Sequence, residues 1–230
     1  VVDAALDAGI NYFDTAESYS KGVSEELLGA ALAGRRDEAL IATKWGGGWR
    51  PVEGAPGHPD VVRASVEGSL RRLGVEHIDH YQLHQPDDDT PIADTLGVLA
   101  ELRDAGKIRE IGCSNFSAEQ LDEAAEVAAE LDVAPFASVQ NHYSLLTRDP
   151  ERDGVLAACG RTGTAFVPYF PLESGVLTGK YRRGESFPEG TRLASMGDRA
   201  ERFAGDDRLE TVEQLGEFAA GSGHTVLDLA

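Results

Sequence analysis

The chain has 230 residues, 41% of them hydrophobic, which is the composition of a folded protein with one sizeable core rather than of a disordered chain. Forty acidic against 21 basic side chains give a net charge of -19, which disfavours nucleic acid and anionic lipid surfaces as partners. The apolar runs are too short to cross a bilayer. We therefore expect neither nucleic-acid nor membrane partners. The composition does not indicate which oligomeric state the protein adopts.

Strand-like runs begin near residues 10, 39, 77, 107, 136 and 164, about 30 residues apart, with helical patterns in most of the intervals. A first helix is expected over residues 1–8. Ser24 is a candidate N-cap for a second helix that continues through Leu32 and stops at Gly34. The third helix is expected from Pro59 to Leu73, where one apolar stripe ends at a glycine.

The later helices show equally specific boundaries. One pattern runs from Pro91 to Ala105 and ends at Gly106. Ser117 opens another with the spacing of a capping box, because Gln120 follows three residues later. A last helix is expected from Thr225. Between these elements, residues 46–51 and 171–207 are predicted to be long loops, and the second of them is partly basic, which suits an anionic ligand.

Strands that alternate with helices predict an α/β fold with parallel pairing. The first strand-to-helix turn, residues 14–22, lacks the G-x-G-x-x-G pattern of a doubly wound dinucleotide-binding sheet, and polar residues follow every strand. Both observations favour a (β/α)8 TIM barrel. Only six strands are visible, so we expect barrel strands 2 to 7 here, strands 1 and 8 to be missing, and residues 1–230 to form a single truncated barrel domain.

Four polar residues lie at the ends of three successive strands: Asp14, Tyr19, Lys44 and His84. A barrel places such strand ends around one rim. A lysine ammonium beside a tyrosine stabilises the phenolate, and an aspartate keeps that lysine charged, so Tyr19 could act as a general acid. Taken one at a time these residues have structural alternatives, namely a rim ion pair of Asp14 with Lys44 and a hydrogen-bonded rim histidine.

Metal-based chemistry is the less favoured interpretation. His77, His80 and His84 are close in sequence, but strand alternation points His77 away from the other two. The two cysteines, Cys113 and Cys159, form no C-x-x-C pair and no disulfide framework. We expect no metal and, with no secretion signal at the start of the sequence, a cytoplasmic location.

Several blocks of sequence resemble the aldo-keto reductase family, in that family's order and over essentially the whole chain. They are GINYFDTAESY at 9–19, SEELLG at 24–29, IATK at 41–44, DHYQLHQP at 79–86, GKIREIGCSNF at 106–116 and QNHYS at 140–144. The resemblance implies a (β/α)8 oxidoreductase that reduces aldehydes or ketones with NADP as its cofactor, NAD being the alternative. A small-molecule carbonyl compound is the implied substrate.

The resemblance also implies roles for individual residues. Tyr19 would donate the proton, Asp14 and Lys44 would tune the acidity of Tyr19, and His84 would orient the carbonyl and help polarise it. Ser114, Asn115 and Gln140 would hold the nicotinamide carboxamide, and Tyr169 would stack under its ring. The remaining implied cofactor contacts are Leu172, Gly175, Leu177 and Lys180, in a loop that suits a pyrophosphate.

Other expectations concern neighbouring residues. Phe170 stands where the family commonly has serine, which removes one polar contact. Trp45 and Trp49 are expected to line the substrate entrance, and His142 to be an ordinary surface or loop residue. Two alternative functions follow from the same resemblance: a cofactor-sensing regulatory subunit, as in potassium-channel accessory subunits, and a catalytically inactive fragment of a reductase.

Overall fold

A computed structural model describes residues 1–230 and contains one parallel sheet of six strands in the order β1-β2-β3-β4-β5-β6. The strands are β1 (Tyr12–Asp14), β2 (Leu40–Trp45), β3 (Ile78–Leu83), β4 (Ile108–Ser114), β5 (Ser138–His142) and β6 (Ala165–Tyr169). The six runs expected from the sequence are thus confirmed, each displaced by no more than two residues.

Strand order in the sheet follows strand order in the chain, so each crossover leads to the neighbouring strand. A doubly wound sheet instead reverses direction at a switch point. Consecutive pairings such as Asp14 with Ala42, Ala42 with His80, and His80 with Glu110 run around the sheet in register. The arrangement confirms the α/β prediction and is that of an incomplete (β/α)8 barrel.

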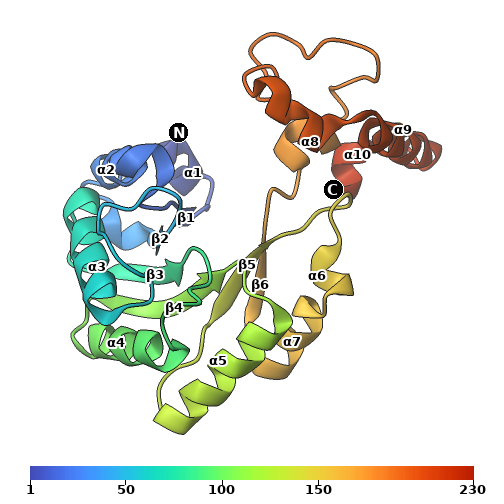
Figure 1. Cartoon of the computed structure of the whole chain (residues 1–230). Helices are drawn as coiled ribbons and strands as arrows, with labels where there is room; N and C mark the ends of the chain where they lie inside the picture. Colours follow the sequence, from blue (N-terminus) through green and yellow to red (C-terminus); the bar gives the residue numbers. More distant parts are fainter. The chain divides into compact units, whose positions relative to one another are not determined.

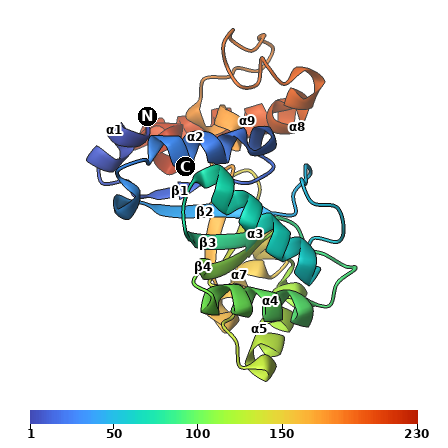
Figure 2. The same cartoon turned by 90° about the vertical axis from the view of Figure 1, so that its left-hand side faces the viewer.

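The chain divides into two compact units, described separately below. Unit 1 comprises Val1–Gln140 and Asp153–Val167, and unit 2 comprises Asn141–Arg152 and Pro168–Ala230. Unit 1 holds most of the sheet, with helices laid along one face of it (Figures 1 and 2). These helices are α1 (Val2–Asp7), α2 (Val23–Ala31), α3 (Pro59–Leu73), α4 (Ile92–Asp104), α5 (Ala118–Leu131) and α7 (Val155–Thr162).

The core of unit 1 lies between the sheet and these helices. Apolar residues of α3 and α4, such as Val62, Val66 and Leu99, pack against Ile41 and Ile78 of the strands. Each of these side chains is fully removed from water, and burying one stabilises the fold by roughly 1.5–3 kcal/mol. The other face of the sheet carries the polar side chains of the candidate site.

Local sequence signals set most helix ends where they were expected. His58 caps α3, whose first residue is Pro59, and Gly74 takes the left-handed conformation after its last residue. Ser117 and Gln120 form both hydrogen bonds of a capping box at the start of α5. Two expectations for α2 were wrong. Its N-cap is Gly22, so Ser24 lies within the first turn, where its hydroxyl pairs with that of Thr15. The helix ends at Ala31, and Gly34 lies in the turn beyond it with a φ of 85°.

Unit 2 is helical and has its own core. Its elements are the α-helices α6 (Asp149–Arg152), α8 (Glu201–Ala204), α9 (Asp206–Gly221) and α10 (Val226–Leu229), and the 3₁₀ helices η3 (Glu173–Thr178) and η4 (Gly197–Ala200). Leu193, Ala200 and Ala204 are buried among the side chains of η3 and α9. The expectation of a long loop over 171–207 was wrong in part: residues 179–196 contain no helix or strand, whereas η3, η4, α8 and the start of α9 occupy much of the rest. Apolar residues of the segment also build this core.

Candidate active site

The carboxyl ends of β1, β2 and β3 bring four predicted site residues together within unit 1. Asp14 is the last residue of β1, Lys44 lies one residue before the end of β2, and His84 directly follows β3. Tyr19 begins the 3₁₀ helix η1 (Tyr19–Gly22), which follows β1. Parallel neighbours present successive strand ends at one edge, so residues far apart in sequence share a site.

Lys44 is the buried centre of this group. Its side chain is 2% exposed, and its Nζ donates to Asp14 Oδ2 at 2.6 Å and to the carbonyl oxygen of Thr15 at 2.7 Å. Burial lowers the pKa of Lys44, and the attraction of the Asp14 carboxylate opposes that shift. The site therefore holds a desolvated ammonium that depends on one carboxylate.

Tyr19 and His84 both lie beside that ammonium. Lys44 Nζ is 5.1 Å from the centroid of the Tyr19 ring, and the rings of Tyr19 and His84 meet edge to face at 5.9 Å. Tyr19 is 42% exposed, so a ligand can reach its ring. Burial, together with the positive charge of Lys44, lowers the pKa of His84 to about 4. His84 is consequently neutral at pH 7.

Three further predicted residues form a hydrogen-bonded chain at the ends of β4 and β5. Ser114 Oγ donates to the Gln140 carbonyl oxygen at 2.9 Å, and Asn115 Nδ2 donates to Ser114 Oγ and to the His84 carbonyl oxygen. Gln140 Nε2 donates to Asp14 Oδ1 at 2.8 Å. Asn115 has a φ of 64°, a conformation that costs about 1–3 kcal/mol and is typical of functional sites.

A buried charged network behind the loop that carries Tyr19 was not predicted from the sequence. Glu25, fully buried on α2, accepts hydrogen bonds from Thr43 and from Arg72 Nε, each at 2.6 Å. Glu17 accepts from the amide of Gly46 at 2.9 Å. Burial raises the pKa of Glu17 to about 7. Acidic residues in helix-start and loop segments look solvent-exposed in sequence, which is why this network was missed.

The expectation that Trp45 lines a substrate entrance was wrong. Trp45 is completely buried, its ring stacks on Tyr81 at 4.4 Å, and its Nε1 donates to the Pro56 carbonyl oxygen. Because side chains alternate along a strand, Trp45 faces the helices whereas Lys44 faces the site. Trp49 is half-buried in the loop after β2.

The other predicted cofactor residues belong to unit 2. Tyr169 ends β6, and Leu172 precedes η3, in which Gly175 has a φ of 95°. A Cβ added at Gly175 would lie 3.1 Å from Lys180 Nζ, so this ammonium sits directly over the glycine backbone. The side chain of Leu177 is fully buried in the core of unit 2, which leaves only its backbone available to a ligand.

His142 of unit 2 is not the ordinary surface residue that was expected. Its ring lies parallel to that of Tyr169 at 5.4 Å, and its Nε2 hydrogen-bonds to Glu173 Oε1 at 3.0 Å. Glu173 is completely buried. No local pattern joins residues 31 positions apart in two segments interpreted as loops, so sequence reasoning had no signal for this pair.

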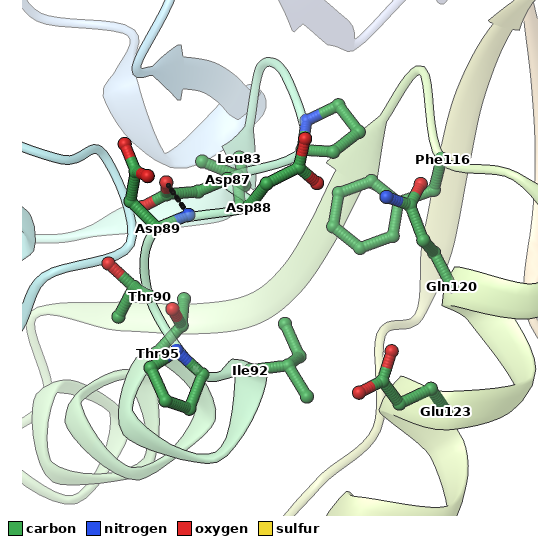
Figure 3. Close-up of a pocket in the computed structure, with 12 residues that line it drawn as sticks. Leu83, Asp87, Asp88, Asp89, Thr90, Ile92, Thr95, Phe116, Gln120 and Glu123 are labelled. Atoms are coloured by element: carbon green, nitrogen blue, oxygen red, sulfur yellow. Dashed lines mark hydrogen bonds between the residues drawn. The ribbon is translucent and has the colours of Figure 1, made fainter.

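A separate cavity of about 400 Å³ lies in unit 1 between the loop after β3 and the start of α5. Figure 3 shows Asp87, Asp88 and Asp89 on one side of it and Phe116 and Glu123 on the other. Each carboxylate oxygen of Asp87 already accepts a hydrogen bond, one from the amide of Gly57 and the other from the amide of Asp89. None of the predicted catalytic residues lines this cavity.

No group of three or more His, Cys, Asp or Glu side chains is arranged to hold a metal ion. Both ring nitrogens of His80 are engaged, by Tyr12 Oη at 2.8 Å and Ser138 Oγ at 3.2 Å. None of the helices combines the length and the apolar character needed to cross a bilayer. The cytoplasmic location stays a prediction.

Comparisons with known proteins show what the chain is similar to. The family model described as "Aldo/keto reductase family" matches residues 1–230. The chain is 38% identical to the aldo-keto reductase YhdN of Bacillus subtilis, with all of this chain and 68% of that protein covered. It is 34% identical to a probable voltage-gated potassium channel subunit beta of Oryza sativa, covering all of this chain and 71% of the relative.

Two further relatives bear on cofactor and fold. The aldo-keto reductase yakc [NADP(+)] of Schizosaccharomyces pombe is 37% identical, covering 98% of this chain and 66% of its own length. The solved structure of a glycerol dehydrogenase from Gluconobacter oxydans superimposes with a TM-score of 0.79 at 36% identity, covering 99% of this chain and 69% of that one.

Proposed function

Since the chain belongs to the aldo-keto reductase family, we propose that it reduces aldehydes or ketones to alcohols with NADPH, with Tyr19 as the proton donor. The single observation that carries this proposal is the meeting of Tyr19, His84 and the buried Lys44 ammonium at one edge of the sheet. These are a proton donor, a neutral hydrogen-bond donor and a fixed positive charge. Together they can stabilise a carbonyl oxygen that gains negative charge during reduction.

Tyr19 is the residue suited to give up a proton. The Lys44 ammonium, 5.1 Å from the centre of its ring, stabilises the phenolate that remains after proton transfer to the carbonyl oxygen. Lys44 can do so only while charged, and its burial works against that charge. The hydrogen bond to Asp14 at 2.6 Å offsets this penalty, so Asp14 acts on Tyr19 through Lys44.

His84 serves a different role. With a pKa lowered to about 4, it carries no charge near pH 7 and cannot be the acid of the reaction. A neutral imidazole has one N–H, which can donate a hydrogen bond to the carbonyl oxygen and orient it toward Tyr19.

A bound nicotinamide cofactor would supply the hydride. Ser114, Asn115 and Gln140 offer hydroxyl and amide groups for its carboxamide, and Tyr169 an aromatic ring for stacking. Two observations in unit 2 fit its diphosphate: Lys180 lies over the backbone of Gly175, and Ser174 Oγ is buried without a partner. The backbone turns of Leu172, Gly175 and Leu177 complete that cradle. The name of the yeast relative supports NADP over NAD.

The test is Tyr19→Phe, which removes only the hydroxyl. We expect the rate of NADPH oxidation with a reactive aldehyde such as 4-nitrobenzaldehyde to fall roughly 10²- to 10⁴-fold. NADPH affinity, measured by fluorescence titration, should stay within about twofold, because the ring remains. An unchanged rate would contradict the assignment of Tyr19 as the acid.

A second function is favoured by the similarity to a probable potassium channel subunit beta. In such a role the same site would sense a bound cofactor rather than turn it over. Retention of NADP through purification, turnover slower than about one per minute and binding to a channel protein would support it. Sustained multiple turnover would contradict it and support the reductase.

A further inference from the structure

The parallel rings of His142 and Tyr169 form a stacked pair within unit 2. Their centroids are 5.4 Å apart and their planes differ by 16°, and the ring of Phe170 meets both edge to face. His142 therefore covers one face of the Tyr169 ring. A planar ligand group stacked on Tyr169 would have to use the opposite face.

His142 is held in place by the carboxylate of Glu173. Glu173 Oε1 accepts hydrogen bonds from His142 Nε2 at 3.0 Å, from Thr147 Oγ1 at 2.7 Å and from Ser144 Oγ. Because an ionised carboxylate only accepts, Nε2 must carry the hydrogen, and the plane of the His142 ring is fixed by that bond.

Glu173 is itself firmly anchored. It is 0% exposed, and its Oε2 forms an ion pair with Arg208 Nη2 of α9 at 3.0 Å. A carboxylate is found so deep in a protein only when it is paired and hydrogen-bonded. Glu173 thus joins the segment after β5, the segment after β6 and α9 at one point.

The backbone around Glu173 is strained, and the side-chain contacts hold it. Phe170, Glu173 and Ser174 have φ values of 52°, 48° and 56°. Each such residue costs of order 1–3 kcal/mol and persists only where its surroundings determine the conformation. These residues lie within five positions after Tyr169, so the anchoring of Glu173 also constrains the path of the chain as it leaves Tyr169.

From this arrangement we propose that His142, fixed by Glu173, is a positioning residue that holds the Tyr169 ring in the plane required for stacking on the nicotinamide. The proposal rests on the proposed function, in which Tyr169 is the stacking residue. It goes beyond that function by assigning a task to a histidine and a buried glutamate that would touch neither cofactor nor substrate. His142 acts only through Tyr169.

The experiment compares binding of NADPH with binding of 2′-phospho-ADP-ribose, which lacks the nicotinamide, by isothermal titration calorimetry. His142→Gln removes the ring, and we expect it to lower the affinity for NADPH relative to the fragment by about 3- to 10-fold. His142→Phe keeps a ring without the bond to Glu173 and should lower that ratio by less than His142→Gln. His224→Gln, the same substitution at an exposed histidine of unit 2, should leave the ratio unchanged.

A double-mutant cycle tests whether the effect passes through Tyr169. In a Tyr169→Leu background, His142→Gln should produce no further change in the ratio. An equal change in both backgrounds, or no change in either, would overturn the positioning role while leaving the proposed reductase intact. If the unaltered protein binds neither nucleotide, the proposed function fails and this proposal fails with it. Thermal unfolding of each variant distinguishes a general loss of protein stability from a change confined to binding of the nicotinamide.

Discussion

Lys44 and Asp14 form an ion pair whose two members differ sharply in exposure. Nζ and Oδ2 are 2.6 Å apart, yet the side chain of Lys44 is 2% exposed and that of Asp14 is 34% exposed. Asp14 also accepts hydrogen bonds from Gln140 and Gln82. Lys44, by contrast, donates hydrogen bonds to two acceptors, Asp14 and the Thr15 carbonyl oxygen. The lysine therefore depends on the aspartate far more than the reverse.

This asymmetry predicts unequal costs for the two single substitutions. Asp14→Asn should destabilise the protein by about 3 kcal/mol, because it leaves a buried ammonium without its counter-ion. Lys44→Met should change stability by no more than about 1 kcal/mol, since Asp14 keeps two amide donors and contact with water. Urea unfolding midpoints measure both, and equal losses would contradict the assigned dependence. Both variants should lose reductase activity, since Lys44→Met removes the positive charge beside Tyr19 and Asp14→Asn removes the carboxylate that favours the charged form of Lys44.

The lowered pKa of His84 predicts a dependence of stability on pH. The folded-state pKa is about 4 and the ordinary value is 6.5, so between these pH values the unfolded chain binds the extra proton. The contribution of His84 to the free energy of unfolding is therefore complete above pH 6.5. As the pH falls toward 4, the protein loses up to about 3 kcal/mol of this stability. His84→Gln should remove this slope in unfolding experiments from pH 4.5 to 8. The exposed control His224→Gln should preserve it.

The sequence predicted the parts of the fold that local chemistry determines. Periodicity located the strands, and residues with restricted backbones or capping side chains, such as Pro59, Gly74 and Ser117, located helix ends. The four residues at the strand ends could be predicted because parallel strands of a barrel share one rim. Strand alternation could likewise have separated Trp45 from Lys44, and the wrong expectation for Trp45 came from treating it as part of the loop after β2.

What the sequence did not predict depends on contacts across long separations. Glu25 and Arg72 are 47 residues apart on two helices, and each looks like a solvent-facing charge in its own segment. The same holds for Glu173, which lies in a stretch rich in glycine and charge but is completely buried. The helix α9 was missed because it begins inside the segment 171–207 that was interpreted as a loop.

The raised pKa of Glu17 predicts that stability depends on pH with the opposite sign to the effect of His84. Burial, aided by the negative charge of Glu25, raises its pKa from 4.5 to about 7, whereas the Gly46 amide and Arg72 partly counteract this. Between pH 4.5 and 7 the folded protein keeps the proton that the unfolded chain releases, so stability falls as the pH rises.

Glu17→Gln should therefore gain stability relative to the unaltered protein as the pH rises through this range, levelling off above pH 7 at about 2–3 kcal/mol. The glutamine oxygen can still accept from the Gly46 amide. Denaturant unfolding at pH 5, 6, 7 and 8 measures the difference. Glu53→Gln, at an exposed position of the loop after β2, is the matched control and should show none. A difference independent of pH would contradict the buried, protonated glutamate.

The backbone just after Tyr19 is left-handed at three successive residues. Ser20 and Lys21 have φ values of 50° and 57°, and Gly22 has a φ of 91°. A side chain in this region costs roughly 1–2 kcal/mol, and glycine avoids that cost but loses more entropy on folding. Ser20→Gly should consequently stabilise the protein by about 0.5–1 kcal/mol.

Gly22→Ala should act in the opposite direction. Its Cβ would meet Arg72 Cδ at 2.7 Å in addition to the unfavourable φ, and Arg72 could move away only by weakening its 2.6 Å hydrogen bond to Glu25. We expect a loss of more than about 2 kcal/mol by thermal or denaturant unfolding. Because the loop positions Tyr19, the rate of carbonyl reduction should fall in Gly22→Ala even at temperatures where the variant is fully folded. A stable, fully active Gly22→Ala protein would show that this loop does not depend on the contact between Gly22 and Arg72.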